Sequence, residues 1–185
     1  DGRSVGIIAN QPAVMAGCLD INASDKSARF IRFCDAFNIP VVTLTNVKEY
    51  AADMQEEKTI SQAVADLTYA FASADVPRIN VITGEAYGSA YVSMNSKHIG
   101  ADLVLALDSA KVGVMDAKVA AQILCEDEIS QAANTKEALE EKAKEFDTLQ
   151  DGATAAAKRG YVDNVISGSE IRKHLIYALQ MFGMR

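Results

Sequence analysis

Short apolar runs alternate with segments of helical periodicity along most of the chain, and this alternation constrains the fold more than any other feature. The predicted strands are residues 4–9, 41–45, 78–83, 102–107 and 112–115. Val, Ile and Leu fill these runs almost without polar alternation, which is typical of strands buried on both faces. Strands and helices that alternate in this order form a mostly parallel sheet surrounded by helices. The sequence therefore predicts an α/β fold in a single domain.

Amphipathic helices are predicted between and after these strands. Phe30, Phe33, Cys34 and Phe37 follow the spacing of one apolar helical stripe. Ser24 is the expected N-cap of that helix, and Pro40 prevents its continuation. The predicted helices are residues 24–37, 60–71, 89–98, 117–125, one or two polar helices within 127–149, 153–158 with Gly160 at the C-cap, and 168–182 with a capping box of Ser167 and Glu170.

Composition and charge exclude several classes of protein. Of the 185 residues, 49% are hydrophobic and 23% are charged, which is a globular composition. The net charge is −7, and nine acidic side chains and three lysines lie between residues 126 and 151. No basic patch that would attract nucleic acid or an anionic membrane is visible. No apolar run approaches the roughly 20 residues that span a bilayer. Neither nucleic-acid binding nor membrane insertion is expected.

Common catalytic and metal-binding patterns are missing. Cys18, Cys34 and Cys125 are odd in number and far apart, so no disulfide framework or metal site is predicted. Cys34 lies on an apolar helical stripe and is expected to be a buried thiol. His98 and His174 are expected to be packed or surface side chains on helices. The chain contains no P-loop, G-x-G-x-x-G, H-E-x-x-H or C-x-x-C pattern.

One segment has the physical features of a binding site. The predicted strand 78–83 leads into Gly84-Glu85-Ala86-Tyr87-Gly88-Ser89-Ala90-Tyr91 and then into a helix. Gly84 and Gly88 permit a tight turn and close backbone approach. Ser89 and Ala90 would open the helix with N–H groups that have no acceptor within it, and such amides can polarise a carbonyl or stabilise an oxyanion. On pattern alone, an ordinary strand-to-helix turn whose glycines serve packing is favoured.

Four longer stretches carry a resemblance to a known family. They are Gly6-Ile-Ile-Ala-Asn-Gln-Pro12 with Gly17-Cys-Leu-Asp-Ile21, residues 26–40, Ala86-Tyr-Gly-Ser-Ala-Tyr91 with Ser96-Lys-His-Ile-Gly-Ala-Asp102, and residues 157–166. In order and spacing the chain resembles the C-terminal half of the carboxyltransferase subunits of biotin-dependent acyl-CoA carboxylases, of the propionyl-CoA carboxylase β-subunit type. The resemblance implies a crotonase (ClpP/crotonase-like) fold. It also implies that residues 1–185 are one domain of a longer, two-domain subunit.

The same resemblance implies a site and a reaction. In the family motif Ala-Tyr-Gly-Gly-Ala-Tyr, the amides of the second glycine and of the alanine hold the ureido carbonyl of biotin, and these positions are Ser89 and Ala90 here. Tyr87, Gly88, Tyr91 and Val92 are the implied substrate-binding positions. The implied reaction is carboxyl transfer between carboxybiotin and an acyl-CoA, with no metal in this domain.

Several partners and a location are implied as well. The carboxybiotin would be carried by a biotin carboxyl carrier protein or domain. The other partners are an N-terminal carboxyltransferase half, which is expected to bind the nucleotide end of the acyl-CoA, and further copies of the subunit in a homo-oligomer. The scattered cysteines make a reducing, cytoplasmic location the default.

Two departures from the family pattern leave alternatives open. Where the family usually has Asp-Val-Pro-Gly-Phe and further glycines, this chain has Asn46-Val-Lys-Glu-Tyr50, with no Pro or Gly before Thr59. Where the family tends to Gly-Ala-x-Gly, it has Asp116-Ala-Lys-Val119. The lost glycines favour a non-catalytic structural paralogue, whereas the retained Tyr87–Tyr91 segment favours a carboxyltransferase. A biotin-dependent acyl-CoA decarboxylase subunit is a further alternative.

Overall fold

A six-stranded parallel sheet forms the centre of the molecule. The computed structural model describes residues 2–51, 58–132, 134–150 and 152–183. The strand order is β1-β2-β3-β4-β6, and β5 pairs with the end of β3. The strands are β1 (Gly6–Ala9), β2 (Val41–Val47), β3 (Arg78–Tyr87), β4 (Leu103–Leu107), β5 (Lys111–Gly113) and β6 (Asn164–Ile166). The predicted α/β class and parallel sheet are confirmed.

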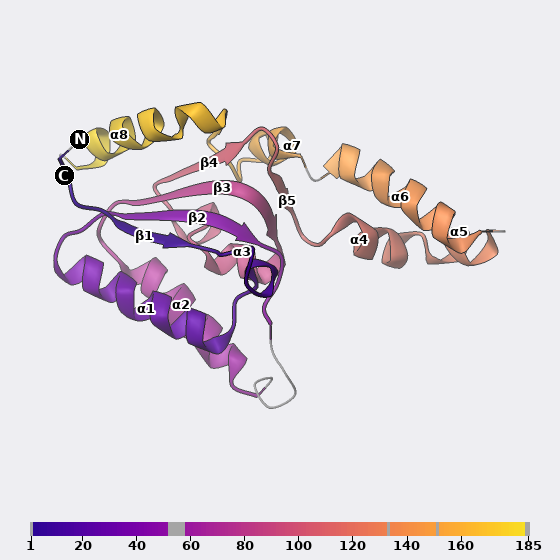
Figure 1. Ribbon diagram of the computed structural model, residues 1–185, viewed down its shortest axis with the longest axis horizontal. Coiled ribbons are helices and arrows are strands. Elements are labelled where there is room, and N and C mark those ends of the chain that lie inside the picture. Colours follow the sequence, from indigo (N-terminus) through magenta and orange to yellow (C-terminus); the bar gives the residue numbers. More distant parts are fainter. Residues whose placement is uncertain (1, 52–57, 133, 151, 184–185) are drawn as a thin grey trace.

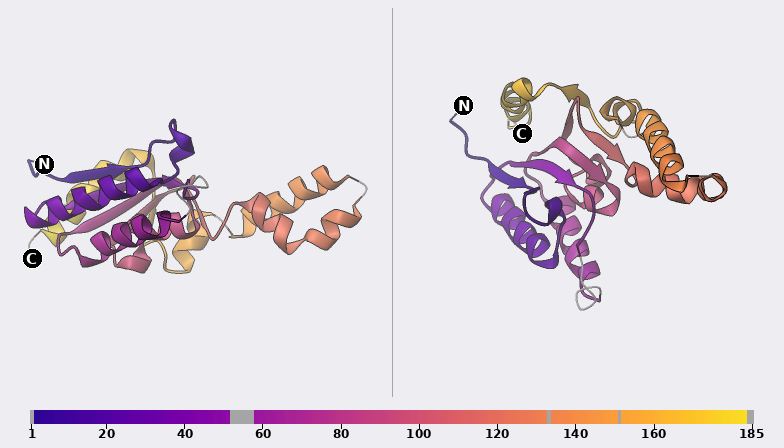
Figure 2. Two further views of the ribbon diagram at one scale, coloured as in Figure 1. Left: turned by 90° about the horizontal axis from the view of Figure 1, so that it is seen from below. Right: turned by 45° about the vertical axis from the view of Figure 1, so that its right-hand side comes forward.

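Helices cover both faces of this sheet and also extend beyond it. They are η1 (Met15–Gly17), α1 (Ile21–Ala36), α2 (Ile60–Ser73), α3 (Gly88–Ser93), η2 (Lys97–Ile99), α4 (Ala117–Leu124), α5 (Glu126–Gln131), α6 (Thr135–Gln150), α7 (Ala153–Lys158), η3 (Gly168–Glu170) and α8 (Ile171–Phe182). Helices α1 and α2 lie on one side of the sheet and α8 lies on the other (Figure 1). Helices α4, α5 and α6 form an arm that projects away from the sheet (Figure 2).

Two strand predictions are wrong. Residues 84–87, which were expected to lie in a tight turn, are instead the last part of β3, which continues to Tyr87, and the turn is confined to Gly88. The strand is extended because Val47 pairs with Ala86 beyond a bulge in β2, and β5 pairs with Glu85, Ala86 and Tyr87 from the other side. Strand β6 was not predicted, because three residues with one buried side chain show no periodicity.

Helix ends also differ from the predictions. Helix α1 is capped by Asp20, whose Oδ1 accepts a hydrogen bond from Ala23 N at 2.6 Å, and Ser24 lies inside the helix with its hydroxyl donating to Asp20 O at 2.8 Å. The helix expected to reach His98 ends at Ser93, because Asn95 adopts a left-handed conformation with φ +54°.

Other predicted ends are confirmed in part. The capping box of Ser167 and Glu170 is present, with Ser167 N donating to Glu170 Oε2 at 3.3 Å. The C-cap of α7 is Arg159 rather than the predicted Gly160, which lies one residue beyond it with φ +82°. The acidic stretch forms the two polar helices α5 and α6. None of the described helices is long and apolar enough to cross a bilayer.

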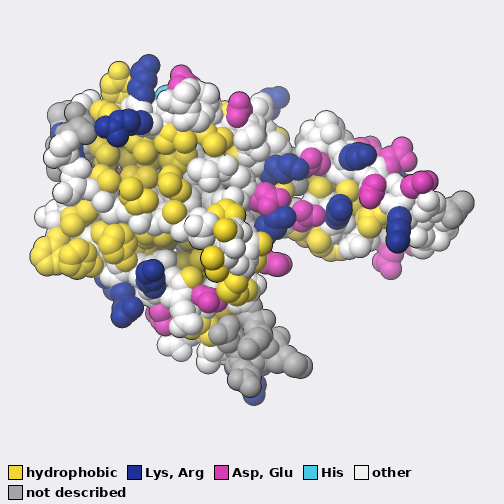
Figure 3. Space-filling model, in the orientation of Figure 1, with side chains coloured by type: hydrophobic (Ala, Val, Ile, Leu, Met, Phe, Trp, Pro, Cys, Tyr) yellow, Lys and Arg dark blue, Asp and Glu magenta, His cyan; other side chains and the backbone are white. Residues whose placement is uncertain are grey.

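The main core lies between the sheet and the pair α1 and α2. Ile31, Leu67, Phe71, Ile82 and Val104 are each fully buried in it, and the predicted buried thiol of Cys34 belongs to the same core. The opposite face of the sheet is covered less completely. A groove of about 440 Å³ runs between α8 and the β1–β2 side, where hydrophobic side chains gather on the surface (Figure 3).

Strand β1 and helix α1 approach so closely that residue 6 has no room for a side chain. A Cβ atom on Gly6 would lie 2.5 Å from Cys34 Sγ and 3.2 Å from Phe30 Cε1. We expect Gly6→Ala to lower the free energy of unfolding by about 1–3 kcal/mol, as overpacked cores do. Denaturant unfolding measures this value. Cys34→Ala removes the clashing sulfur, so the double variant should lose less stability than the sum of the single variants, whereas additive losses would contradict the close approach.

Candidate functional site

The candidate site lies where β3 ends and α3 begins. Tyr87 is the N-cap of α3 with extended backbone angles, and Gly88 follows with φ +58°. A Cβ atom on Gly88 would also lie 3.1 Å from Val114 O, in the segment that follows β5. Both the positive φ and the close backbone approach require glycine at this position. The chain therefore turns sharply from strand to helix at Gly88, one residue before the candidate amide donors.

The motif residues divide into a buried set and an accessible set. Tyr87, Ala90 and Tyr91 are buried, at 2%, 1% and 3% exposure. Ser89 is exposed, whereas Gly88 and Val92 are partly exposed. The N–H groups of Ser89 and Ala90 belong to the first turn of α3, in which amides have no acceptor within the helix. The accessible part of the motif is thus Gly88 and Ser89, with Val92 nearby in sequence.

Tyr91 is a packing residue in this arrangement. Burial raises the pKa of Tyr91 to about 12, with a smaller contribution from Tyr161. The ring of His98 meets the Tyr91 ring edge-on at 6.1 Å between centroids and lies 4.9 Å from the ring of Tyr161. The Tyr91 hydroxyl has no hydrogen-bond partner among the described residues. The high pKa keeps this phenol neutral at ordinary pH, so Tyr91 supplies packing rather than charge.

Asn46, at the first departure from the family pattern, links β2 to β3 beside the motif. Its Oδ1 accepts a hydrogen bond from Glu85 N at 3.0 Å, and its own N donates to Asn10 Oδ1 at 3.1 Å. A Cβ atom on Gly84 would lie 2.7 Å from Asn46 Oδ1, so the expected close approach at Gly84 is present. The Lys48 ammonium pairs with the Glu85 carboxylate at 3.1 Å. Much of the altered loop, at residues 52–57, lies outside the described residues.

The second departure has a structural explanation at one of its two positions. Asp116 is the N-cap of α4, and its Oδ1 accepts a hydrogen bond from Lys118 N at 2.9 Å. Aspartate at this position satisfies an amide that glycine would leave to water. The first of the two lost glycines is therefore replaced by a capping interaction at the start of α4, whereas Val119 at the second has no structural explanation.

Two further residues of the site were missed by sequence reasoning. The hydroxyl of Tyr50 forms a hydrogen bond with Ser93 Oγ on α3. Ser93 Oγ in turn lies 3.1 Å from Ser89 O and 3.1 Å from Ala90 O. Tyr50 and Ser93 are 43 residues apart, and no local pattern signals such a contact.

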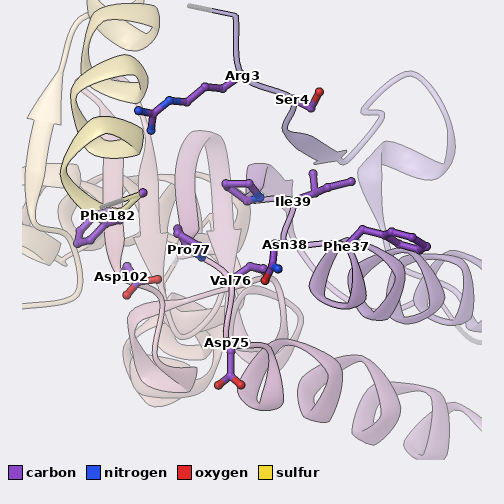
Figure 4. A pocket seen from close by; sticks show the side chains of 12 residues that line it. Arg3, Ser4, Phe37, Asn38, Ile39, Asp75, Val76, Pro77, Asp102 and Phe182 are labelled. Carbon is purple, nitrogen blue, oxygen red and sulfur yellow. The ribbon is translucent and has the colours of Figure 1, made fainter. Parts of the chain in front are cut away.

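A separate pocket of about 870 Å³ lies at the opposite ends of the strands from the motif. It is lined by residues that precede the strands, among them Pro40, Pro77 and Asp102, and by Arg3 and Phe182 near the two ends of the chain (Figure 4). Because all strands are parallel, this pocket is at their amino ends, whereas the motif follows the carboxyl end of β3. The pocket is therefore not part of the candidate site. Across the described ranges, no group of three or more His, Cys, Asp or Glu side chains is placed to hold a metal ion.

The fold is that of the crotonase-like carboxyltransferases. The chain matches the crystal structure of the transcarboxylase 12S hexamer, solved with methylmalonyl-CoA and methylmalonic acid bound, with a TM-score of 0.94 and 43% identity. The match covers 100% of this chain and 36% of that chain. The β subunit of geranyl-CoA carboxylase from P. aeruginosa has the same fold, with a TM-score of 0.85 and 21% identity over 98% of this chain and 35% of that chain.

Sequence comparison assigns the family. Residues 1–183 match the model of the carboxyl transferase domain, and the chain belongs to this family. It is 47% identical to the propionyl-CoA carboxylase β chain of Saccharopolyspora erythraea, over 98% of this chain and 34% of that protein. It is 46% identical to the methylmalonyl-CoA decarboxylase subunit α of Veillonella parvula, over 100% of this chain and 35% of that protein. The chain thus spans about a third of the length of these curated relatives.

Proposed function

We propose that this chain is the biotin-side domain of a biotin-dependent acyl-CoA carboxyltransferase. The observation that carries the proposal is the first turn of α3, where Gly88 has φ +58° and the N–H groups of Ser89 and Ala90 have no acceptor within the helix. The resemblance puts the two amides that the family motif presents to biotin at Ser89 and Ala90, in this first turn. An amide donor requires no particular side chain, so serine in place of glycine at residue 89 preserves the donor.

The chain's own contribution to the reaction would be electrostatic. Carboxybiotin would supply the carboxyl group as CO2, and the ureido nitrogen freed by that loss would supply the base for the α-proton of the acyl-CoA. The N–H groups of Ser89 and Ala90 donate to the ureido carbonyl, where negative charge develops. Preorganised donors of this kind stabilise an oxyanion without reorganisation at the moment of reaction. Gly88 lets the ligand approach the backbone, and Val92 offers an apolar wall. No side-chain general base is needed from this domain.

The remaining partners belong to the same proposal. The domain would act with an N-terminal carboxyltransferase half that holds the CoA nucleotide, and with a biotin carboxyl carrier protein or domain. We propose residues 1–185 as one domain of a two-domain, cytoplasmic subunit that forms a homo-oligomer. The hexamer of the related transcarboxylase 12S and the incompletely covered sheet face beside α8 support assembly with further subunits.

A reconstituted assay tests the proposal. The chain is assembled with its N-terminal half, and malonyl-CoA and methylmalonyl-CoA are supplied with free biotin as acceptor. We expect biotin-dependent formation of acetyl-CoA or propionyl-CoA, measured by chromatography of the CoA esters. A folded, assembled protein without turnover of either substrate would favour the non-catalytic paralogue. The same turnover is expected of a biotin-dependent acyl-CoA decarboxylase subunit, because one enzyme catalyses a carboxyl transfer in both directions.

A further inference from the structure

Two hydrogen-bonded hydroxyl groups connect the segment that follows β2 to the peptides of the candidate amides. The first is the hydroxyl of Tyr50, which contacts Ser93 Oγ. The backbone around Tyr50 is fixed on both sides, because Leu19 N donates to Glu49 O at 3.2 Å and Ala51 N donates to Leu19 O at 2.8 Å. Leu19 itself is buried at 4% exposure. The position of the Tyr50 ring is therefore set by the core rather than by the loop that follows.

The direction of the hydrogen bonds follows from the capacity of each group. Carbonyl oxygens only accept, and a serine hydroxyl has a single proton. Ser93 Oγ must therefore donate its one proton to the carbonyl oxygens of Ser89 and Ala90, each of which lies 3.1 Å from it. Tyr50 then donates its own proton to Ser93 Oγ. Burial raises the pKa of Tyr50, so the phenol keeps its proton at neutral pH.

One of the two carbonyls that Ser93 contacts, that of Ser89, belongs to the same peptide unit as the candidate donor Ala90 N–H. Ser89 C=O and Ala90 N–H are the two ends of one peptide unit, so a hydrogen bond to the carbonyl strengthens the N–H as a donor. Consecutive hydrogen bonds reinforce one another by about 10–30% per bond in condensed phase. Ser93 and Ala90 are each 1% exposed, and the low dielectric of the interior preserves this polarisation.

Other hydrogen bonds hold the far end of α3 independently. Ser96 Oγ donates to Val92 O at 2.7 Å, and Asn80 Nδ2 donates to Met94 O at 3.1 Å. The helix is therefore expected to form without the Tyr50 hydroxyl. The Tyr50–Ser93 chain is then available to adjust the first turn rather than to create the helix.

We propose that Tyr50 and Ser93 are positioning residues for the reaction, and that they fix and polarise the Ser89–Ala90 peptide so that Ala90 N–H is a stronger donor to the ligand. This inference rests on the proposed function of that amide. The two residues act through the peptide and do not touch the ligand. Because Tyr50 acts through Ser93, their contributions are not independent.

Kinetics of the assembled protein test the polarisation. We expect Tyr50→Phe to lower kcat of biotin-dependent turnover by about three- to tenfold, the range for loss of one hydrogen bond, with KM for biotin unchanged. Tyr50→Phe in a Ser93→Ala background should have no further effect on kcat. Ser96→Ala is the matched control, because it removes a buried hydroxyl that contacts another peptide of the same helix; it should lower Tm and leave kcat unchanged. A kcat within twofold of the parent for Tyr50→Phe, or an equal loss in Ser96→Ala, would overturn the proposal.

Hydrogen exchange separates this inference from the proposed function. Exchange of the amides of residues 88–93, followed by mass spectrometry, needs no turnover. We expect Tyr50→Phe to accelerate exchange in this segment by about three- to tenfold, whereas Tyr177→Phe, which removes an exposed hydroxyl on α8, should not change it. If the parent protein is inactive but exchange accelerates, the proposed function fails and the anchoring of α3 stands. Unchanged exchange would overturn the positioning role even in an active protein.

Discussion

Ser89→Pro is expected to reduce biotin-dependent turnover by about 10²–10³-fold, the usual cost of one oxyanion donor. Proline has no N–H, so the substitution deletes one of the two candidate donors and keeps the backbone nearby. Residue 89 is the second residue of α3, in the first turn, where proline removes no hydrogen bond of the helix. The preceding residue is Gly88, whose missing Cβ relieves the crowding that proline causes. Turnover is measured in the assembled protein.

Matched variants separate loss of the amide from loss of the fold. Thr154→Pro places proline at the second residue of α7, which has six residues like α3, and Thr154 is exposed like Ser89. We expect this variant to retain activity. Ser89→Gly keeps the N–H and removes only the side chain, so it should retain or increase activity. Similar turnover in Ser89→Pro and Thr154→Pro would show that the N–H of Ser89 is not a donor in the reaction.

Phe71→Ala is expected to lower the free energy of unfolding by about 3–5 kcal/mol, the usual cost of a large buried aromatic. Phe71 is fully buried on α2, in the core between that helix and the sheet. Its removal leaves a cavity that the surrounding β-sheet cannot close by a small shift, because strands in a parallel sheet are fixed by hydrogen bonds on both sides. Chemical denaturation of the parent and variant measures the difference.

Tyr69 provides the control on the same helix. Its side chain is 68% exposed, so Tyr69→Ala makes a similar chemical change without a cavity. We expect a loss of about 0.5 kcal/mol or less, as for most surface substitutions. Similar losses for the two variants would show that α2 does not pack against the sheet through Phe71.

Much of the fold could be predicted because its strands are buried on both faces. The runs at residues 41–45 and 103–107 consist mainly of Val and Leu, and they coincide with strands β2 and β4 inside the sheet. Helix ends were less certain, since Asp20 and Ser24 are both good N-caps four residues apart. The helix begins at Ile21 because the parallel bridge between Leu19 and Tyr50 ends there. Strand β6 exists only because β4 offers it an edge.

The candidate site divides in the same way. The order strand, glycine, small residues, helix is visible at Gly84–Tyr91, since a positive φ and an open first turn depend on neighbours in sequence. The contacts of Asn46 with Gly84 and Glu85, and of Tyr50 with Ser93, join segments about 40 residues apart. Local sequence patterns indicate which faces of a strand or helix are buried and where the backbone can turn. Sheet register and the bulge in β2 set which distant side chains meet, and those depend on the packing of the whole chain.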